Sequence, residues 1–496
     1  MTGATAPPPA LSLRAALAEL RAGPPGAVVE HDEPADRTRV ADHFARAYAG
    51  VPARGVSRPE PAVLYTAVPG GPVLLGLYGD EERLRRWLPG LPERAAPETA
   101  ARLVAEAVRP NAAPVAVSRP PCQEHRTTGA RVDLSGLPVP VLTPRDAGPY
   151  LTAALVRAED PATGRTALSA HRMLVVGRDR LTVWMVPGRQ VKALYEQAVR
   201  EGRPLPVTVN IGVPPAAMVA SALNTRFLPD GLDKLAVAGA LAGRPLAVAP
   251  ALTQPVSALA EAEIVLEGYL DGSVADEALP GAEPRGSLPE FLGFDGGARP
   301  GLPVLTVTAV THRSDPVFQA VIGPGREQSA VLGAAGALSA ALSLRPVLPR
   351  AEGVRVRRLH FAAAGGGMLL LAVAVRKESA AADGGLAVLA RELLERHPFV
   401  KLVVFTDDDV DVGCAEDLLW ALVTRSNLGA DATAWPRLPP VPMDPSQTPD
   451  WAAVRHGAER PPGRVSVDAT TPYALRSRTA RSFRPEAGLA ATGHCR

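Results

Sequence analysis

LTAALVRA (151–158), SAHRMLVV (169–176) and RLTVWMV (180–186) are three apolar runs that follow one another in the middle of this chain. Two turn-forming pieces, DPATG (160–164) and GRD (177–179), separate them. Short apolar runs that alternate with tight turns are typical of antiparallel hairpins. The stretch therefore predicts a hairpin meander, and with it a sheet or barrel of largely antiparallel strands.

The regions on either side predict a mixed α/β protein of several domains. A chain of 496 residues is too long for one compact core. Helix-like and strand-like segments alternate before residue 115 and again after residue 326, which favours α/β units at both ends. After Pro436 proline is dense and periodicity is lost, as in an extended tail. The predicted division is an N-terminal α/β domain (1–115), a central domain (116–325), a C-terminal α/β domain (326–435) and a Pro-rich tail (436–496).

Composition argues against several classes of partner. The chain has 53 basic and 51 acidic residues without a long run of one sign, so neither nucleic acid nor an anionic membrane is expected. The N-terminus lacks the order of a signal peptide, and no apolar run is long enough to span a bilayer. Three scattered cysteines form no CxxC pair, which argues against a zinc site. We expect a cytoplasmic protein.

Lysine is rare in this chain. Only four of the 53 basic residues are lysine: Lys192, Lys234, Lys377 and Lys401. In a chain that otherwise uses arginine, a lysine can mark a place that needs a compact charge on a slim stem. Chance survival on the surface explains each of them equally well.

One acidic residue is a candidate general acid. In PEFLGF (289–294), Glu290 stands among proline, leucine and phenylalanine on a segment too interrupted to be a helix. Apolar surroundings disfavour the charged form of a carboxyl, so such a group can hold a proton near neutral pH and deliver it. The alternative is a surface loop whose glutamate is solvated.

A second acidic cluster, Asp407–Asp409, follows a strand-like run. Neighbouring residues at the end of a strand point to opposite faces, so a structural or solvated edge is a better interpretation than a metal site. The chain has no Walker lysine, no HExxH and no GxSxG motif.

Taken in order, several segments resemble the UbiD family of prenylated-flavin decarboxylases, and the resemblance covers nearly the whole chain. The resemblance implies an N-terminal α/β domain, a central split β-barrel that holds prenylated FMN, and a C-terminal domain that oligomerises, so that the protein would be a dimer or larger. The matching segments are VDLSGLPVPVLTPRDAGPYLTAALVRAEDPATG (132–164), HRMLVVGRDRL (171–181), LPVTVNIGVPPA (205–216), LAVAGALAG (235–243), AEIVLEG (262–268), EFLGF (290–294), VKLVVFTDDDVDV (400–412) and LLWALVTR (418–425).

The resemblance assigns catalytic roles to an arginine and two acids. The arginine matches Arg172, and the proton donor matches Glu290. The family's other acid lies five residues before the donor, where this chain has Arg285, and Glu283 could replace it only if the loop slips by two residues.

The resemblance also exposes a departure. Relatives bind a divalent metal beside the cofactor phosphate through an Asn, a His and a Glu. At these positions the chain has Ala167, Arg189 (with Gln190 next to it) and Lys234, none of which is a good ligand for such a metal.

Two hypotheses account for this loss. In the first, Arg189 and Lys234 hold the phosphate directly without a divalent metal, together with Lys401, which aligns with a cofactor-contacting lysine of the family. The protein would then decarboxylate an α,β-unsaturated or aromatic acid, with a flavin prenyltransferase supplying the cofactor. In the second, the flavin site has decayed, and the protein catalyses a different step on a natural product or serves as a non-catalytic assembly subunit.

Overall fold

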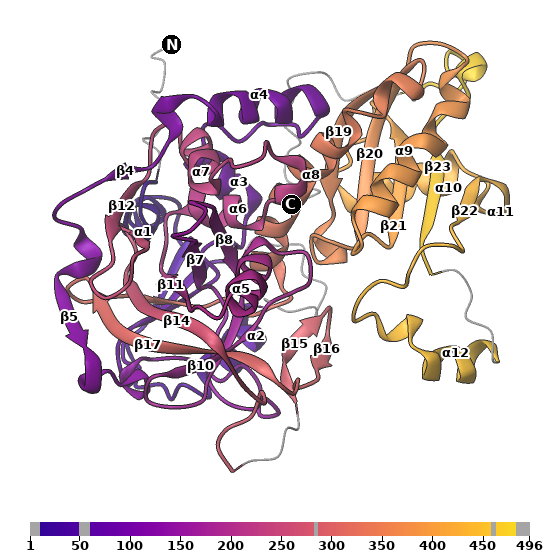
Figure 1. The fold of residues 1–496 in the computed structure, drawn as a ribbon. Coiled ribbons are helices and arrows are strands. Elements are labelled where there is room, and N and C mark those ends of the chain that lie inside the picture. Colours follow the sequence, from indigo (N-terminus) through magenta and orange to yellow (C-terminus); the bar gives the residue numbers. More distant parts are fainter. Residues whose placement is uncertain (1–9, 49–59, 282–285, 458–462, 483–496) are drawn as a thin grey trace. The chain divides into compact units, whose positions relative to one another are not determined.

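The computed structural model describes residues 10–48, 60–281, 286–457 and 463–482, which form two compact units (Figure 1). The first unit holds most of the chain up to Val331, and the second holds residues 92–102 and the chain from Leu332 onward. Strands and helices occur in both units, which confirms the predicted mixed α/β fold. In the described part of the chain, no helix is both long enough and apolar enough to cross a membrane.

A small sheet lies at the start of the first unit. Its strand order is β1-β2-β3-β18, and β18 comes from far along the sequence. Residues of the predicted N-terminal and central domains therefore share one sheet. Its elements are β1 (Val28–His31), β2 (Ala62–Tyr65), β3 (Val73–Leu75) and β18 (Phe318–Gln319), with the helices α1 (Leu13–Arg21), α2 (Val40–Tyr48) and α3 (Glu81–Trp87).

The centre of the first unit is a nine-stranded sheet of order β6-β9-β10-β17-β14-β11-β7-β8, with β5 paired to β17. All its recorded pairings are antiparallel, and the hairpins β7–β8 and β9–β10 coincide with the meander predicted from the sequence. In Figure 1 the long strands β14 and β17 run side by side through this sheet. The strands are β5 (His125–Thr128), β6 (Tyr150–Leu151), β7 (Leu155–Glu159), β8 (Thr166–Ala170), β9 (Arg172–Val175), β10 (Arg180–Trp184), β11 (Leu205–Ile211), β14 (Ile264–Ala275) and β17 (Leu302–His312).

Alternation along the strands gives this sheet its two faces. Val156, Val209 and Leu266 are cross-strand neighbours on β7, β11 and β14, and all are fully buried in the main core. Burying each such side chain contributes about 1.5–3 kcal/mol. The next residues along, Arg157 and Thr208, point to the opposite face, where polar contacts form.

Three helices and two small sheets complete the first unit. Strand β8 contacts α5 (Gln190–Arg200), α6 (Pro215–Ala222) and α7 (Lys234–Ala242). A β-hairpin of β15 (Ser287–Phe291) and β16 (Phe294–Gly296) carries Glu290. The remaining strands are β4 (Val115–Ala116), β12 (Ala247–Pro250) and β13 (Ser257–Leu259).

The second unit is built on a five-stranded sheet of order β19-β20-β21-β23-β22. Strand β23 lies parallel to β21, so the segment predicted to be an extended tail after Pro436 supplies a strand of this sheet and the helix α12. The elements are α4 (Pro97–Ala107) and α8 (Arg326–Leu344), which both run across the division between the units, β19 (Val354–Phe361), β20 (Leu370–Lys377), α9 (Ala382–Arg396), β21 (Leu402–Asp407), α10 (Ala415–Thr424), α11 (Leu428–Asp431), β22 (Ala432–Ala434), α12 (Pro449–His456) and β23 (Val465–Ala469).

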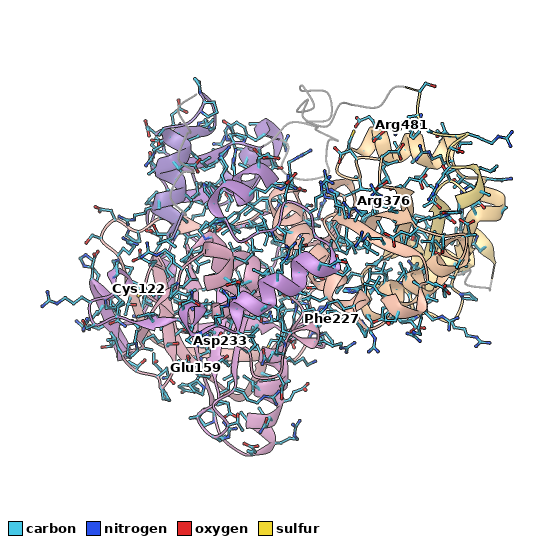
Figure 2. The ribbon with its side chains drawn as sticks, turned by 90° about the horizontal axis from the view of Figure 1, so that it is seen from above. Cys122, Glu159, Phe227, Asp233, Arg376 and Arg481 are labelled. Carbon is cyan, nitrogen blue, oxygen red and sulfur yellow. The ribbon has the colours of Figure 1, made fainter. Side chains whose placement is uncertain are left out.

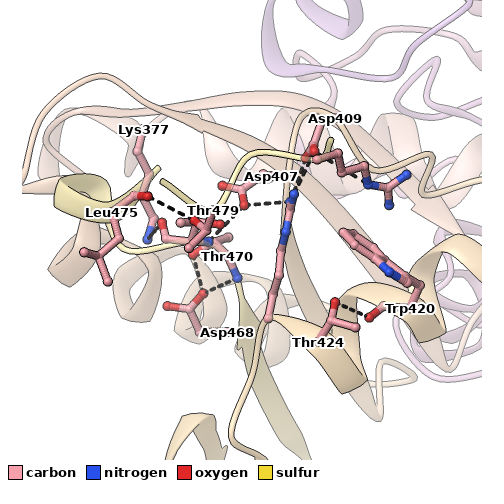
Figure 3. Close-up of polar contacts among 12 residues, drawn as sticks. Lys377, Asp407, Asp409, Trp420, Thr424, Asp468, Thr470, Leu475 and Thr479 are labelled. Carbon is pink, nitrogen blue, oxygen red and sulfur yellow. Dashed lines mark hydrogen bonds and ion pairs between the residues drawn. The ribbon is translucent and has the colours of Figure 1, made fainter. Parts of the chain in front are cut away.

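The acidic residues at the end of β21 hold structure together, as the structural interpretation predicted (Figure 3). Arg425 donates to Asp407 at 2.9 Å and to both oxygens of Asp409 at 2.6 and 2.7 Å. Asp408 points elsewhere and pairs with Arg376. Arg425 and Arg481 both lie over the ring of Trp420, so this network ties residues beyond β23 to the sheet.

Candidate active site

Arg172, at the start of β9, lies between two carboxylates. Its Nη2 donates to Glu277 Oε2 at 2.6 Å, and its Nη1 lies 2.5 Å from Glu290 Oε1. The side chains of Arg172, Glu277 and Glu290 are only 7%, 1% and 11% exposed. Charge-assisted contacts this short in a buried place fix all three groups relative to one another. The structure thus brings together the arginine and the proton donor that the sequence singled out.

Glu277 was missed by the sequence analysis. It lies just beyond the end of β14, much further before Glu290 than the five residues that the resemblance implies. Glu283 and Arg285, the two residues considered for this position, lie outside the described residues, so Glu283 stays a prediction. The loop between β14 and β15 separates Glu277 from Glu290 along the chain, and their contacts with Arg172 bring them together. A search for acids near the ends of strands, instead of at a fixed spacing, would have found it.

The surroundings of Glu290 differ from both sequence-based alternatives. The side chain is neither solvated nor in an apolar pocket, because Arg172 and Arg299 flank it, with Arg299 Nη2 3.4 Å from Oε2. The apolar prediction failed because neighbouring residues on a strand point to opposite faces. Phe291 follows Glu290 on β15 and its ring lies near that of Phe294 instead.

Glu277 lies in the most buried part of this cluster. Burial raises the pKa of Glu277, and the neighbouring Arg172 partly opposes the rise. Tyr150, on β6, is fully buried, and burial together with the Glu277 charge raises the pKa of its hydroxyl. Tyr150 therefore stays neutral, and it can act toward Glu277 only as a neutral group.

The hairpin that carries Glu290 is held to Arg172 by a second contact. Ser287 Oγ accepts from Arg172 Nη1 at 3.1 Å, and Ser287 pairs across the hairpin with Gly296. A Cβ at Gly296 would come 2.2 Å from Ser287 Oγ, so only glycine fits there. Gly296, on β16, is thus part of what positions the hairpin that carries the acid.

A second group of residues lies at the starts of α5 and α7, the helices that contact β8, and it is rich in positive charge. Arg189 is the N-cap residue of α5, and its side chain makes no capping hydrogen bond. Lys234 is the first residue of α7. Lys234 is 4% exposed, and its Nζ donates to the backbone oxygen of Ser221 at 2.7 Å. Within the described part of the chain, neither Arg189 nor Lys234 has a carboxylate partner. Burial lowers the pKa of both, and the charge of Arg189 lowers that of Lys234 further.

The charges of Arg189 and Lys234 also affect His171. Its ring lies between Ser169 Oγ (2.8 Å from Nε2) and the backbone oxygen of Trp184 (3.1 Å from Nδ1). Burial, with Arg189 next in size, lowers the pKa of His171 to about 4. His171 is therefore neutral near pH 7 and adds no charge to those of Arg189 and Lys234.

The four lysines differ in whether a carboxylate lies beside them. Lys192, Lys377 and Lys401 each lie within 3.6 Å of a carboxylate oxygen, of Glu196, Asp383 and Asp444 respectively. Lys234 is the lysine without such a partner in the described ranges. Burying an ammonium without a counter-ion is costly, so a place beside Lys234 would favour an anion.

The helix that carries Lys234 is anchored firmly. Asp233 caps α7 by accepting from Leu235 N at 2.8 Å, and Arg157 grips Asp233 through both guanidinium nitrogens at 2.9 and 3.2 Å. Arg157 also lies 2.8 Å from Glu159, and both acids are labelled in Figure 2. The carboxylate of Asp233 therefore accepts hydrogen bonds both from Arg157 and from the first turn of α7.

The other predicted cofactor contacts are placed as follows. Ala167, on β8, is 2% exposed and offers no atom that could bind a metal. Gln190 is the first residue of α5, beside Arg189. Lys401 belongs to the second unit, where Asp444 and Ser446 hold its Nζ at 2.7 and 2.8 Å, so its contact with a cofactor stays a prediction. Among the described residues, no three His, Cys, Asp or Glu side chains are grouped in a way that could hold a metal ion.

Comparison with known families matches most of the chain. Residues 114–327 match the 3-octaprenyl-4-hydroxybenzoate carboxy-lyase Rift-related domain, and residues 334–469 match the C-terminal domain of the same carboxy-lyase. The chain belongs to the UbiD family. The strands that carry Arg172 and Glu290 both lie in the first of these domains.

Individual relatives of the UbiD family cover nearly the full length. Gallate decarboxylase of Lactiplantibacillus plantarum is 28% identical over 439 residues, which are 86% of this chain and 88% of that protein. The structure of the Klebsiella pneumoniae 3,4-dihydroxybenzoic acid decarboxylase AroY superposes with a TM-score of 0.84 at 31% identity, covering 96% of this chain and 97% of that one. HmfF of Pelotomaculum thermopropionicum in complex with FMN has a TM-score of 0.77 at 29% identity, covering 96% and 97%. An evolved dimeric form of HmfF in complex with prFMN has a TM-score of 0.73 at 28% identity, covering 94% and 96%.

Proposed function

We propose that this UbiD-family protein decarboxylates an aromatic carboxylic acid with the help of prenylated FMN. The observation that carries the proposal is the buried guanidinium of Arg172 between Glu277 and Glu290. An arginine beside a possible proton donor suits a reaction that removes carboxylate and returns a proton. The names of the gallate and 3,4-dihydroxybenzoic acid decarboxylases favour an aromatic acid over an alkenyl one.

In this proposal, the reaction exchanges the carboxylate of the acid for a proton, and CO₂ leaves. Arg172 binds the substrate carboxylate, because its planar fork suits two carboxylate oxygens. Glu290 gives its proton to the ring carbon that loses CO₂ and regains one from solvent. Glu277 holds Arg172 in place. When bound, the modified flavin supplies the electron sink that an aryl carbanion needs.

Arg189 and Lys234 would hold the cofactor phosphate, with no divalent metal between. Lys234 is buried and Arg189 is half-buried, and neither has a carboxylate partner among the described residues, so the pair fits a phosphate. The start of α5 adds backbone N–H groups that favour an anion. Gln190 is the first of the residues that offer such groups. A phosphate dianion beside Lys234 would favour its charged form and so oppose the lowering of its pKa by burial.

The proposal extends to partners. A flavin prenyltransferase would supply the modified cofactor, and the chain would form a homo-oligomer, as the evolved dimeric form of HmfF does.

The test is to co-express the chain with a flavin prenyltransferase and to incubate the purified protein with a panel of hydroxylated benzoic acids. We expect a bound flavin chromophore, and release of CO₂ together with the matching phenol. Glu290→Gln should keep the chromophore and lose turnover.

Two results would contradict this function. Loaded protein that decarboxylates none of the aromatic acids would favour a different reaction on the same fold. Protein that retains no flavin under these conditions would favour the non-catalytic subunit.

A further inference from the structure

Arg299 is an arginine near the candidate active site to which the resemblance assigns no role. It lies between β16 and β17, and its side chain is 33% exposed. Its guanidinium carbon lies 4.0 Å from the centroid of the Trp184 ring, at the end of β10. A guanidinium at this distance over an indole is held by cation–π attraction. Its position is therefore set by the sheet, because Trp184 pairs across β10 and β9 with Arg172.

Arg299 contacts both acids that flank Arg172. Its backbone N–H donates to Glu277 Oε2 at 3.1 Å, and its Nη2 lies 3.4 Å from Glu290 Oε2. Arg172 contacts the other oxygen, Oε1, of Glu290. The two arginines thus hold the carboxyl group of Glu290 from two sides.

This arrangement creates a competition when a substrate carboxylate arrives. The described contacts occupy Nη1 of Arg172 with Glu290 and Ser287, and Nη2 with Glu277. Glu290 is 11% exposed, so a substrate carboxylate that approaches Arg172 from this more open side meets Glu290 on Nη1 and competes with it. Glu277 is 1% exposed and cannot move away as easily.

We propose that Arg299 is a positioning residue for Glu290: it retains the Glu290 carboxyl at the edge of the site when the substrate carboxylate takes over Arg172. This role rests on the proposed decarboxylation. Arg299 contacts Glu290 before the exchange and keeps that contact after it, so Arg299 contributes little to substrate affinity. It contributes to the rate, because a donor held within reach of the carbon transfers its proton far more often than a mobile one.

The experiment compares Arg299→Gln and Arg299→Lys with the wild-type protein loaded with its cofactor. The matched control is Arg145→Gln, an arginine that is 72% exposed and pairs with Asp295 near the same hairpin. We expect Arg299→Gln to lower kcat by about 10–100-fold, which is less than the roughly 10²–10⁴-fold that general acid–base catalysis contributes because the acid itself remains, and to leave KM within about threefold. Arg299→Lys should recover part of kcat, since it restores the charge without the planar fork. Arg145→Gln should behave as the wild type.

A second measurement needs no turnover. Binding of benzoate to flavin-free protein can be followed by tryptophan fluorescence, with Trp184→Phe identifying the signal of Trp184. Arg299→Gln should bind benzoate as tightly as the wild type, within about threefold. Glu290→Gln should bind it more tightly, because an amide oxygen competes less well than a carboxyl group for Nη1 of Arg172.

The outcomes separate the two proposals. A raised KM with unchanged kcat in Arg299→Gln, or weaker benzoate binding, would show that Arg299 binds the substrate and would overturn the positioning role. Unchanged kcat and KM would overturn it as well. If loaded wild-type protein turns over no aromatic acid, the proposed function falls and this role with it.

Discussion

Two buried clusters of the first unit differ in their balance of charge. Around Arg172, two arginines meet two glutamates, and each carboxylate has a cationic partner within 3.4 Å. Around Lys234, two cations and a neutral histidine meet no carboxylate in the part of the chain that the structure describes. The charges of the first cluster balance one another, and the second cluster suits an anion from outside, as we propose.

The difference suggests how the two clusters would be used. A balanced cluster is preorganised, and substrate enters it by exchanging with a group already there. In an unbalanced cluster, unpaired positive charge raises the free energy of the folded protein, and a bound anion lowers it. Such a cluster is suited to retaining a ligand. We interpret the first as the site of chemistry and the second as the site of cofactor retention.

The largest expected effect lies in the balanced cluster. Glu290→Gln should lower kcat by about 10²–10⁴-fold, since the amide cannot donate the proton that a general acid supplies. Bound flavin, measured from the absorbance spectrum, should be unchanged because Glu290 does not belong to the cluster of Lys234. Asp295→Asn is the matched control on the same hairpin, where the acid pairs with exposed Arg145. Activity retained by Glu290→Gln would remove Glu290 from the mechanism.

The next effect lies in the unbalanced cluster. Lys234→Met and Arg189→Met should each weaken FMN binding by about 30–5,000-fold, as expected from removing one partner of a charge pair worth roughly 2–5 kcal/mol. Riboflavin, which has no phosphate, should bind the variants and the wild type alike. The control is Lys192→Met, a lysine that pairs with Glu196 on α5. Equal losses for FMN and riboflavin would mean that the variants damage the fold and not a phosphate contact.

A smaller effect concerns stability and pH. The folded state lowers the pKa of Lys234 well below 10.5, so between the lowered pKa and 10.5 the unfolded chain binds more protons than the folded one. The stability of flavin-free wild-type protein should therefore rise with pH in this window, relative to Lys234→Met. Below the window, Lys234→Met should have the higher Tm, and added FMN should reverse the order. A wild-type Tm that exceeds that of Lys234→Met without FMN at every pH would contradict the inference that burying Lys234 without a counter-ion destabilises the protein.

The smallest effect concerns the support of Lys234. Asp233→Asn keeps a side chain that can cap α7 but loses the ion pair with Arg157. We expect FMN affinity to fall by less than about tenfold, as for the loss of roughly 1 kcal/mol of positioning. Titration of FMN by fluorescence quenching measures this, and a loss as large as that of Lys234→Met would make Asp233 a direct participant.

The sequence predicted the parts of the fold that local pattern encodes. The hairpins between residues 150 and 186 follow from alternating runs and turns, and the structure has them at those places. Strand β23 was not predicted, because its pairing with β21 depends on a partner far along the chain and not on its own Pro-rich surroundings.

The candidate site was predicted in part for the same reason. Arg172 and Glu290 stood in recognisable segments, and the structure brings them together. Glu277 lies in the loop after β14, and Arg299 lies in the loop between β16 and β17. Spacing along such loops does not indicate which side chains meet. Arg189 and Lys234 were noticed because cations replaced expected ligands, but only the structure shows that no described carboxylate balances them.

The most direct test of the account is a titration of FMN into flavin-free protein, with and without a strong chelator of divalent metals and with riboflavin in parallel. The account predicts that FMN binds with the same Kd in the chelator, and far more tightly than riboflavin. FMN affinity that collapses in the chelator and returns with added manganese would contradict it, because a metal and not the pair of Arg189 and Lys234 would then hold the phosphate.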